Sequence, residues 1–104
     1  MGIKKWQKEV DEWAGQFAVP YWSPHEIMAR LMEEVGELAR EVNHRWGPKK
    51  KKAEESEKEL ADEMADVMFT LLCLANSQKI DMNGAWERVM KKCWGRDNNR
   101  YKKK

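Results

Sequence analysis

Apolar residues recur three and four positions apart in four segments of the chain, and this spacing is typical of one face of an α-helix. The segments cover about residues 3–17, 24–44, 53–75 and 82–94. Strict alternation of apolar and polar residues, which would indicate a β-strand, does not persist anywhere in the sequence. The pattern therefore predicts an all-α protein of four helices.

The residues at the ends of these segments support the same helices. Ser23 and Glu26 form a Ser-x-x-Glu capping box at the start of the second helix. Asp81 or Asn83 can cap the fourth helix, and Gly95 ends it. The polar connector between the second and third helices has roughly ten residues, a length that favours antiparallel packing of neighbouring helices. We therefore expect a four-helix bundle-type subunit whose two central helices run antiparallel.

The size and composition of the chain indicate one small folded domain. The chain has 104 residues, of which 41% are hydrophobic and 37% are charged. This apolar fraction is enough for a small core and argues against disorder. We expect a single helical domain over residues 1–95, followed by a basic tail over residues 96–104.

Charge and hydropathy exclude several classes of protein. The net charge of +2 is too balanced to predict nucleic-acid binding. No apolar run approaches the roughly 20 residues of a membrane-spanning helix, and the first residues lack the apolar core of a secretory signal. Cys73 and Cys93 lie far apart and outside any CxxC motif, which is typical of reduced thiols. We therefore expect a cytoplasmic protein that binds neither membranes nor nucleic acids.

Acidic residues are concentrated on the two central helices. The second helix carries Glu33, Glu34 and Glu37, and the third carries Glu63 and Asp66. A helix rotates by about 100° per residue. By this measure Glu34 and Glu37 lie at the same angle from the apolar stripe of their helix as Glu63 and Asp66 do from theirs. If the helices pack antiparallel through these stripes, the four side chains converge along one edge of the pair.

Four converging carboxylates repel one another unless a cation neutralises them. All-oxygen ligands at this density suit Mg²⁺ or Mn²⁺, and such an ion in turn binds phosphate oxygens. Acids beside an apolar stripe also occur as the ordinary solvated face of a helix. The spacing alone therefore leaves both interpretations open.

The two acidic segments resemble a known pair of motifs. Residues 31–39 (LMEEVGELA) and 60–69 (LADEMADVMF) are similar to the EExxE and ExxD motifs of MazG-like nucleotide pyrophosphohydrolases, an all-α superfamily, and the resemblance extends over about residues 22–100. It implies hydrolysis of a nucleoside triphosphate to a nucleoside monophosphate and pyrophosphate. It also implies a set of four Mg²⁺ ligands: Glu34, Glu37, Glu63 and Asp66.

Further site residues follow from the resemblance and from the chemistry of the substrate. Glu33 matches the first acid of EExxE, and with Glu34 it is a candidate catalytic residue beside the ion. Lys49 and Arg96 can bind phosphate groups, and Trp22 can stack on a nucleobase. Each of these last three residues also has an ordinary interpretation, as part of a solvated loop or tail or as packing at a helix boundary.

The apolar pattern also predicts association between copies of the chain. Both central helices carry small or apolar residues away from their main stripe, for example Gly36 and Phe69. Four short helices cannot easily cover both faces, so we expect a homodimer or homotetramer, as the resemblance also implies. The alternative is that the outer helices cover these faces within a monomer. Trp6, Trp13 and Trp86 lie on helical stripes, and we expect them in the core.

The function expected from these observations is that of an enzyme that uses Mg²⁺, or Mn²⁺ in its place. It would cleave (d)NTP to (d)NMP and pyrophosphate and clear non-standard nucleotides, a role that the resemblance alone implies. Two alternatives stay open. One is a pyrophosphohydrolase for phosphoribosyl-ATP or dUTP, and the other is a non-catalytic helical interaction module.

Overall fold

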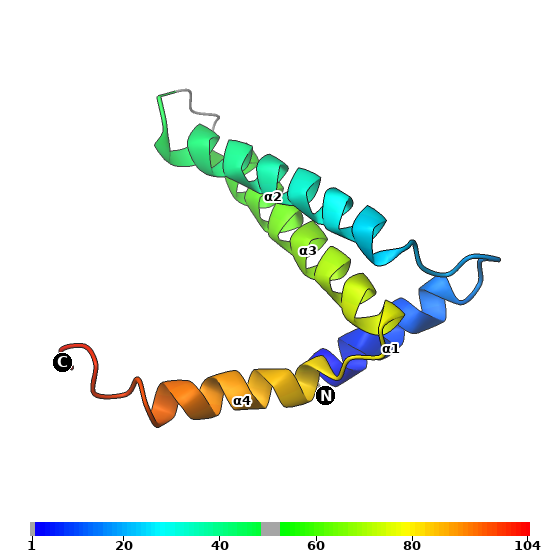
Figure 1. Cartoon of the computed structure of the whole chain (residues 1–104). Coiled ribbons are helices and arrows are strands. Elements are labelled where there is room, and N and C mark those ends of the chain that lie inside the picture. Colours follow the sequence, from blue (N-terminus) through cyan, green and yellow to red (C-terminus); the bar gives the residue numbers. More distant parts are fainter. Residues whose placement is uncertain (1, 49–52) are drawn as a thin grey trace.

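The computed structural model describes residues 2–48 and 53–104, and these residues form four helices (Figure 1). Helix α1 spans Ile3–Ala14, α2 spans Pro24–Trp46, α3 spans Ala53–Ser77 and α4 spans Met82–Trp94. Neither described range contains a strand. The prediction of an all-α chain of four helices is confirmed.

Side-chain hydrogen bonds explain where two of the helices begin. Ser23 starts α2 through the predicted capping box: its Oγ accepts from the N–H of Glu26 at 3.4 Å, and its own N–H donates to Glu26 Oε1 at 3.1 Å. Of the two candidate caps for α4, the structure uses Asp81. Its Oδ1 accepts from the N–H groups of Asn83 and Gly84 at 3.0 and 3.1 Å.

Helix α1 is shorter than its apolar pattern predicted. The pattern continues to Phe17, whereas the helix ends at Ala14. After Gly15 the backbone tightens, because the N–H groups of Gln16 and Phe17 donate to the carbonyl groups of Trp13 and Ala14, three residues earlier. Phe17 therefore lies beyond the helix, on the segment that leads to α2.

The two central helices form an antiparallel hairpin. Helices α2 and α3 lie side by side and run in opposite directions (Figure 1). Helix α1 crosses the open end of this hairpin and packs against α3, while α4 contacts α1 and diverges from the hairpin (Figure 1). The predicted antiparallel order is confirmed. It places the acidic side of α2 next to the acidic side of α3.

The buried core is small and lies where α1 meets the open end of the hairpin. Its apolar members are Val10, Ala14, Ile27, Leu31 and Ala75. The core draws on α1, α2 and α3, and no residue of α4 is buried. Helix α1 and the hairpin therefore form the packed part of the chain.

The prediction that three tryptophans lie in the core is wrong for the single chain. Trp6, Trp13 and Trp86 are 42%, 55% and 54% exposed. Helix α1 touches the end of the hairpin with only part of its surface, and α4 diverges from it, so the described helices of the same chain cover these indole rings only in part.

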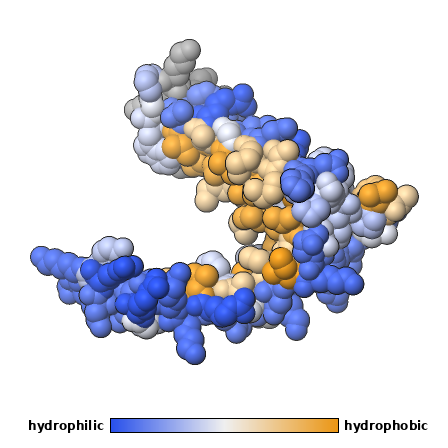
Figure 2. All heavy atoms as spheres, in the orientation of Figure 1, coloured by the Kyte–Doolittle hydropathy of each residue, from blue (hydrophilic) through white to orange (hydrophobic). Residues whose placement is uncertain are grey.

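The four helices do not close into a compact bundle within one chain. Apolar side chains of the hairpin face the open space between it and α4 (Figure 2). The expected bundle-type subunit is therefore only partly formed by a single chain. None of the helices, as far as the chain is described, is both long enough and apolar enough to cross a membrane.

Candidate active site

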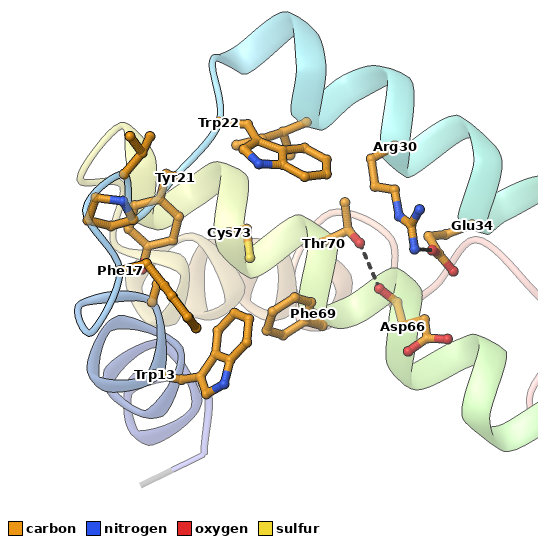
Figure 3. Close-up of a pocket in the computed structure, with 14 residues that line it drawn as sticks. Trp13, Phe17, Tyr21, Trp22, Arg30, Glu34, Asp66, Phe69, Thr70 and Cys73 are labelled. Atoms are coloured by element: carbon orange, nitrogen blue, oxygen red, sulfur yellow. Dashed lines mark hydrogen bonds and ion pairs between the residues drawn. The ribbon is translucent and has the colours of Figure 1, made fainter.

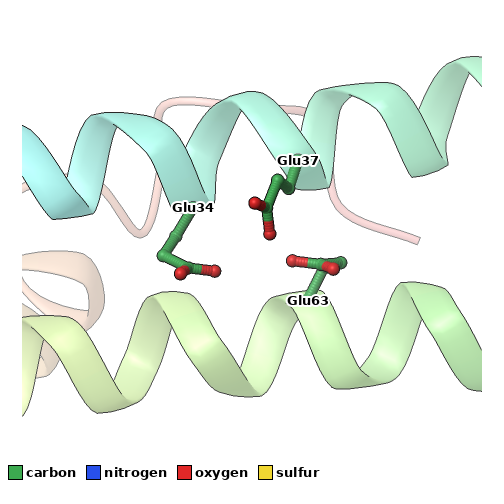
Figure 4. A group of neighbouring side chains, drawn as sticks. All are labelled: Glu34, Glu37 and Glu63. Carbon is green, nitrogen blue, oxygen red and sulfur yellow. The ribbon is translucent and has the colours of Figure 1, made fainter.

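Carboxylates from the two central helices meet inside the hairpin (Figure 4). Glu34 and Glu37 come from α2, and Glu63 comes from α3. Each residue offers a carboxylate oxygen, and these three oxygens lie within 4.8 Å of one another. Antiparallel packing produces this group. The acids of α2 and of α3 lie on the same side of the apolar stripe of their own helix, and two antiparallel helices that pack through these stripes bring those sides together. We call these three residues the acid cluster.

Burial makes negative charge costly in the acid cluster. Glu34 is 3% exposed, and burial raises its pKa from an ordinary value of 4.5; the charges of Glu37 and Asp66 add to this, while Arg30 opposes it. Burial also raises the pKa of Glu63, with further contributions from the neighbouring carboxylates. The Oε2 atoms of Glu34 and Glu63 are buried and have no hydrogen-bond partner among the residues that the structure describes. Unpartnered buried oxygens are rare in folded proteins and require an explanation.

Asp66 lies beside the acid cluster rather than within it. It follows Glu63 by three residues on α3, which is nearly one helical turn, and its side chain is exposed. With Glu34 it lines one end of a cavity. The structure therefore brings three of the four predicted ligands together and places the fourth next to them.

The acid cluster has the donor set of a hard divalent cation. Its donors are all carboxylate oxygens, which Mg²⁺ and Mn²⁺ prefer. A cation would give these two oxygens a partner that the described part of the chain does not supply. It would also remove the repulsion between neighbouring carboxylates. The residues present therefore fit a bound divalent cation.

Arg30 forms an ion pair with the acid cluster that the sequence analysis did not predict. Its Nη2 lies 2.8 Å from Glu34 Oε1, and its Nη1 lies 3.6 Å from Glu33 Oε2. The i,i+4 spacing of Arg30 and Glu34 was the signal that could have found this pair. Glu33 itself has a largely exposed side chain and is joined to the site through Arg30.

A cavity of about 550 Å³ opens beside the acid cluster (Figure 3). Glu34, Asp66 and Arg30 line one part of it, and Thr70 and Cys73 line its floor on α3. Its aromatic lining residues are Trp13, Phe17, Tyr21, Trp22 and Phe69. Trp22, a predicted substrate-binding residue, therefore lies in the same cavity as two of the predicted metal ligands.

The aromatic wall of the cavity is held by ring contacts and hydrogen bonds. The ring of Trp13 meets Phe17 and Phe69 edge to face, with centroids 5.0 and 5.8 Å apart. The hydroxyl of Tyr21 donates to Asp11 and accepts from Nδ2 of Asn76 at 3.1 Å. Burial and the hydrogen bond to Asp11 raise the pKa of Tyr21 to about 12, so this hydroxyl stays protonated at neutral pH.

The other two predicted substrate-binding residues are not placed at this cavity. Lys49 lies outside the described residues. Arg96 follows α4, where its Nε lies 3.2 Å from Asp97 Oδ1, and this segment lies well apart from the hairpin (Figure 1). Within one chain, Arg96 does not reach the acid cluster.

Comparisons with known proteins agree with this geometry. A family profile described as the MazG nucleotide pyrophosphohydrolase domain matches residues 22–101. The Bacillus subtilis (strain 168) protein YpjD is 53% identical over 102 residues, which are 98% of this chain and 92% of YpjD.

Two crystal structures share this fold. One is of B. subtilis YpjD, described as a candidate pyrophosphatase, with a TM-score of 0.80 and 54% identity over 88% of this chain and 94% of that one. The other is of a Bacillus-conserved MazG protein, a nucleotide pyrophosphohydrolase, with a TM-score of 0.77 and 47% identity over 88% of each chain. The chain therefore belongs to the MazG nucleotide pyrophosphohydrolase family, and it is a hydrolase of phosphoanhydride bonds.

Proposed function

We propose that this chain hydrolyses nucleoside triphosphates, of the ribose or deoxyribose series, between the α and β phosphates with the help of Mg²⁺. The products are a nucleoside monophosphate and pyrophosphate. One observation carries the proposal: carboxylates of α2 and α3 converge at the edge of an aromatic cavity, and two of their oxygens are buried without a hydrogen-bond partner among the described residues. Mn²⁺ has the same ligand preference and is expected to replace Mg²⁺.

The cavity and the acid cluster suit the two ends of such a substrate. A volume of about 550 Å³ lies within the range of small-molecule sites, and aromatic rings such as Trp22 can stack on a nucleobase. The nucleoside then occupies the aromatic part of the cavity. Its phosphates extend toward Glu34 and Asp66, because these acids line the same cavity.

In this proposal, the carboxylates of the site bind Mg²⁺, and one carboxylate accepts a proton during hydrolysis. When Mg²⁺ is bound, it neutralises triphosphate charge and polarises the phosphorus that is attacked. The ligands that we assign to it are Glu34, Glu37, Glu63 and Asp66. The oxygen of a water molecule forms a bond to the α-phosphorus, and the bond from that phosphorus to the bridging oxygen breaks, so pyrophosphate leaves. The proton of the water passes to a carboxylate, a role for which we propose Glu33 or Glu34.

The cellular setting follows from the same features. Cys73 and Cys93 are free thiols, as expected in the reducing cytoplasm, and we place the enzyme there. Exposed apolar side chains on the hairpin and α4 support a homodimer or homotetramer. The proposed role is the clearance of non-standard nucleotides.

Pyrophosphate release from a panel of nucleotides tests the proposal. The panel contains standard and modified NTPs and dNTPs, dUTP and phosphoribosyl-ATP, each with Mg²⁺, with Mn²⁺ and with a chelator. We expect release that requires the ion and is fastest with a (d)NTP. Fastest release from phosphoribosyl-ATP or dUTP would assign the enzyme to that substrate instead, and no release from any of them would overturn the proposal.

A further inference from the structure

Arg30 occupies a particular place in the cavity. It lies between Trp22 of the aromatic wall and Glu34 of the acid cluster (Figure 3). Among the described residues that line the cavity, it is the one with a cationic side chain. Suppose that the base of a nucleotide lies against the aromatic wall and that its distal phosphates lie at the acid cluster. Its α-phosphate, the one nearest the sugar, then lies beside Arg30.

The ion pairs of Arg30 with described residues engage only part of its guanidinium. Its short contact is to one oxygen of Glu34, at 2.8 Å, and its contact to Glu33 is longer, at 3.6 Å. The side chain is 51% exposed, whereas that of Glu34 is 4% exposed. A guanidinium has five N–H donors arranged in a planar fork that matches phosphate oxygens. Arg30 can therefore bind a phosphate group without leaving the helix face on which it lies.

We propose that Arg30 binds the α-phosphoryl oxygens of the substrate, and that a cation bound at Glu34 releases Arg30 for this contact. The inference rests on the proposed function. Glu34 Oε1 is the atom that Arg30 holds, and it belongs to a carboxylate of the acid cluster. A divalent cation there competes with the guanidinium for the same negative charge. Arg30 then acts as a catalytic residue, because the phosphoryl group it contacts is the one attacked, and it offsets negative charge there.

The competing interpretation is that Arg30 serves only as the counter-charge of Glu34. The two interpretations differ in what is lost when the guanidinium is removed. A phosphate-binding residue is required for the phosphorylated ligand and not for the ion, whereas a counter-charge that positions Glu34 is required for the ion itself.

The test compares Arg30→Gln and Arg30→Lys with the wild-type chain and with a matched control, Arg40→Gln, which changes another exposed arginine of α2. Calorimetry measures binding of Mn²⁺ alone, of a nucleoside monophosphate with Mn²⁺, and of the unphosphorylated nucleoside. We expect Arg30→Gln to weaken monophosphate binding about 10- to 100-fold, the usual effect of a lost hydrogen bond between charged groups. Nucleoside affinity stays unchanged, and Mn²⁺ binds as tightly as before or more tightly. Arg30→Lys recovers part of the loss, and Arg40→Gln shows none.

Equal monophosphate affinity in the wild-type and Arg30→Gln proteins would overturn the proposal, and so would a parallel loss of Mn²⁺ affinity. Helix content from circular dichroism confirms that each variant is folded. Pyrophosphate release by the wild-type chain separates this proposal from the proposed function. An active wild type with either contrary result overturns the role of Arg30 alone, and an inactive wild type overturns both.

Discussion

Glu34 is held where its negative charge is costly. Its side chain is buried, and its Oε2 has no hydrogen-bond partner in residues 2–48 or in the described side chains that follow the connector. Burial and two neighbouring carboxylates raise its pKa against the influence of Arg30. Costs of this kind are concentrated at functional sites, where a ligand offsets them. At the scale of single residues, this arrangement fits the cation that we propose, because a cation would offset a cost that lowers stability without one.

Neutralising one member of the site tests its role directly. Glu37→Gln and Asp66→Asn keep the shape of each side chain and remove its charge. We expect each to lower pyrophosphate release at least about 100-fold, because a preorganised electrostatic group contributes on this scale, while circular dichroism shows unchanged helices. Glu12→Gln, which neutralises an exposed acid on α1, is the control. Full activity of either site variant would remove that residue from the site.

The stability of the ion-free protein should depend on pH in a particular direction. The pKa values of Glu34 and Glu63 are raised from 4.5 in the folded chain, so the unfolded chain loses these protons at lower pH. Ionisation then favours unfolding, and the free energy of unfolding falls as pH rises above about 4.5. Urea denaturation with chelator present should show this fall in the wild type relative to a Glu34→Gln/Glu63→Gln double variant.

Magnesium provides the control for this pH effect. At neutral pH it should raise the stability of the wild type and have much less effect on the double variant, because binding to the folded state alone stabilises that state. A wild type that gains stability over the double variant as pH rises, without the ion, would contradict the assigned pKa directions.

At the scale of elements, a polar junction attaches α1 to the end of α3. Nε2 of Gln7 donates to Asn76 Oδ1 and to the carbonyl of Ile80, each at 2.8 Å. In turn, Nδ2 of Asn76 donates a hydrogen bond to the backbone carbonyl of Gln7 at 2.8 Å, and the N–H of Met82 donates to Gln7 Oε1 at 3.0 Å. The side-chain amides of Gln7 and Asn76 thus each take part in several hydrogen bonds. We infer that this junction fixes the angle at which α1 crosses the hairpin, and that it thereby positions the aromatic wall that α1 contributes.

Removing the amide of Asn76 should loosen this junction. Asn76→Ala removes the side-chain amide that accepts a hydrogen bond from Gln7 in a partly buried position. Because a partly buried donor then lacks this partner, we expect the free energy of unfolding to fall by about 1–3 kcal/mol. Nucleotide affinity should weaken as well, because the position of Trp13 depends on α1. Asn83→Ala, which removes an exposed amide bonded to Glu87, should change stability by less than about 0.5 kcal/mol. Equal losses in both variants would show that the junction does not hold α1.

The elements differ in how far the sequence predicts them. The α2–α3 hairpin and the meeting of its acids follow from local information, namely helical rotation and a short connector. The cavity does not, because Trp13 and Phe69 meet only once α1 crosses the hairpin. That crossing depends on a contact between Gln7 and Asn76, 69 positions apart in the chain. No local pattern specifies such an angle, which is why Trp13 was expected in the core and lies in the cavity wall instead.

The whole molecule is more open than a compact monomer of its size. Its accessible surface is 8542 Å² for 12.3 kDa, whereas a compact monomer of this mass exposes about 6100 Å². Its radius of gyration is 16.9 Å, against about 13 Å expected for a compact domain. The divergence of α4 contributes to this excess, because it leaves apolar residues of the hairpin and of α4 facing solvent (Figure 2). A second copy that covers these faces would supply the burial that one chain lacks.

Trp86 gives the clearest test of this association. It lies on α4, it is 54% exposed in the single chain, and large aromatic residues contribute most strongly when an interface buries them. We expect the wild type to sediment as a dimer or tetramer and Trp86→Glu to raise the dissociation constant at least about 30-fold, because a charge would then be buried where an indole packed. Arg88→Glu, two residues along the same helix and also exposed, controls for the added negative charge and should leave association intact. A wild type that sediments as a monomer at micromolar concentration would contradict the proposed assembly, because the apolar faces of the hairpin and α4 would then have no second copy to cover them.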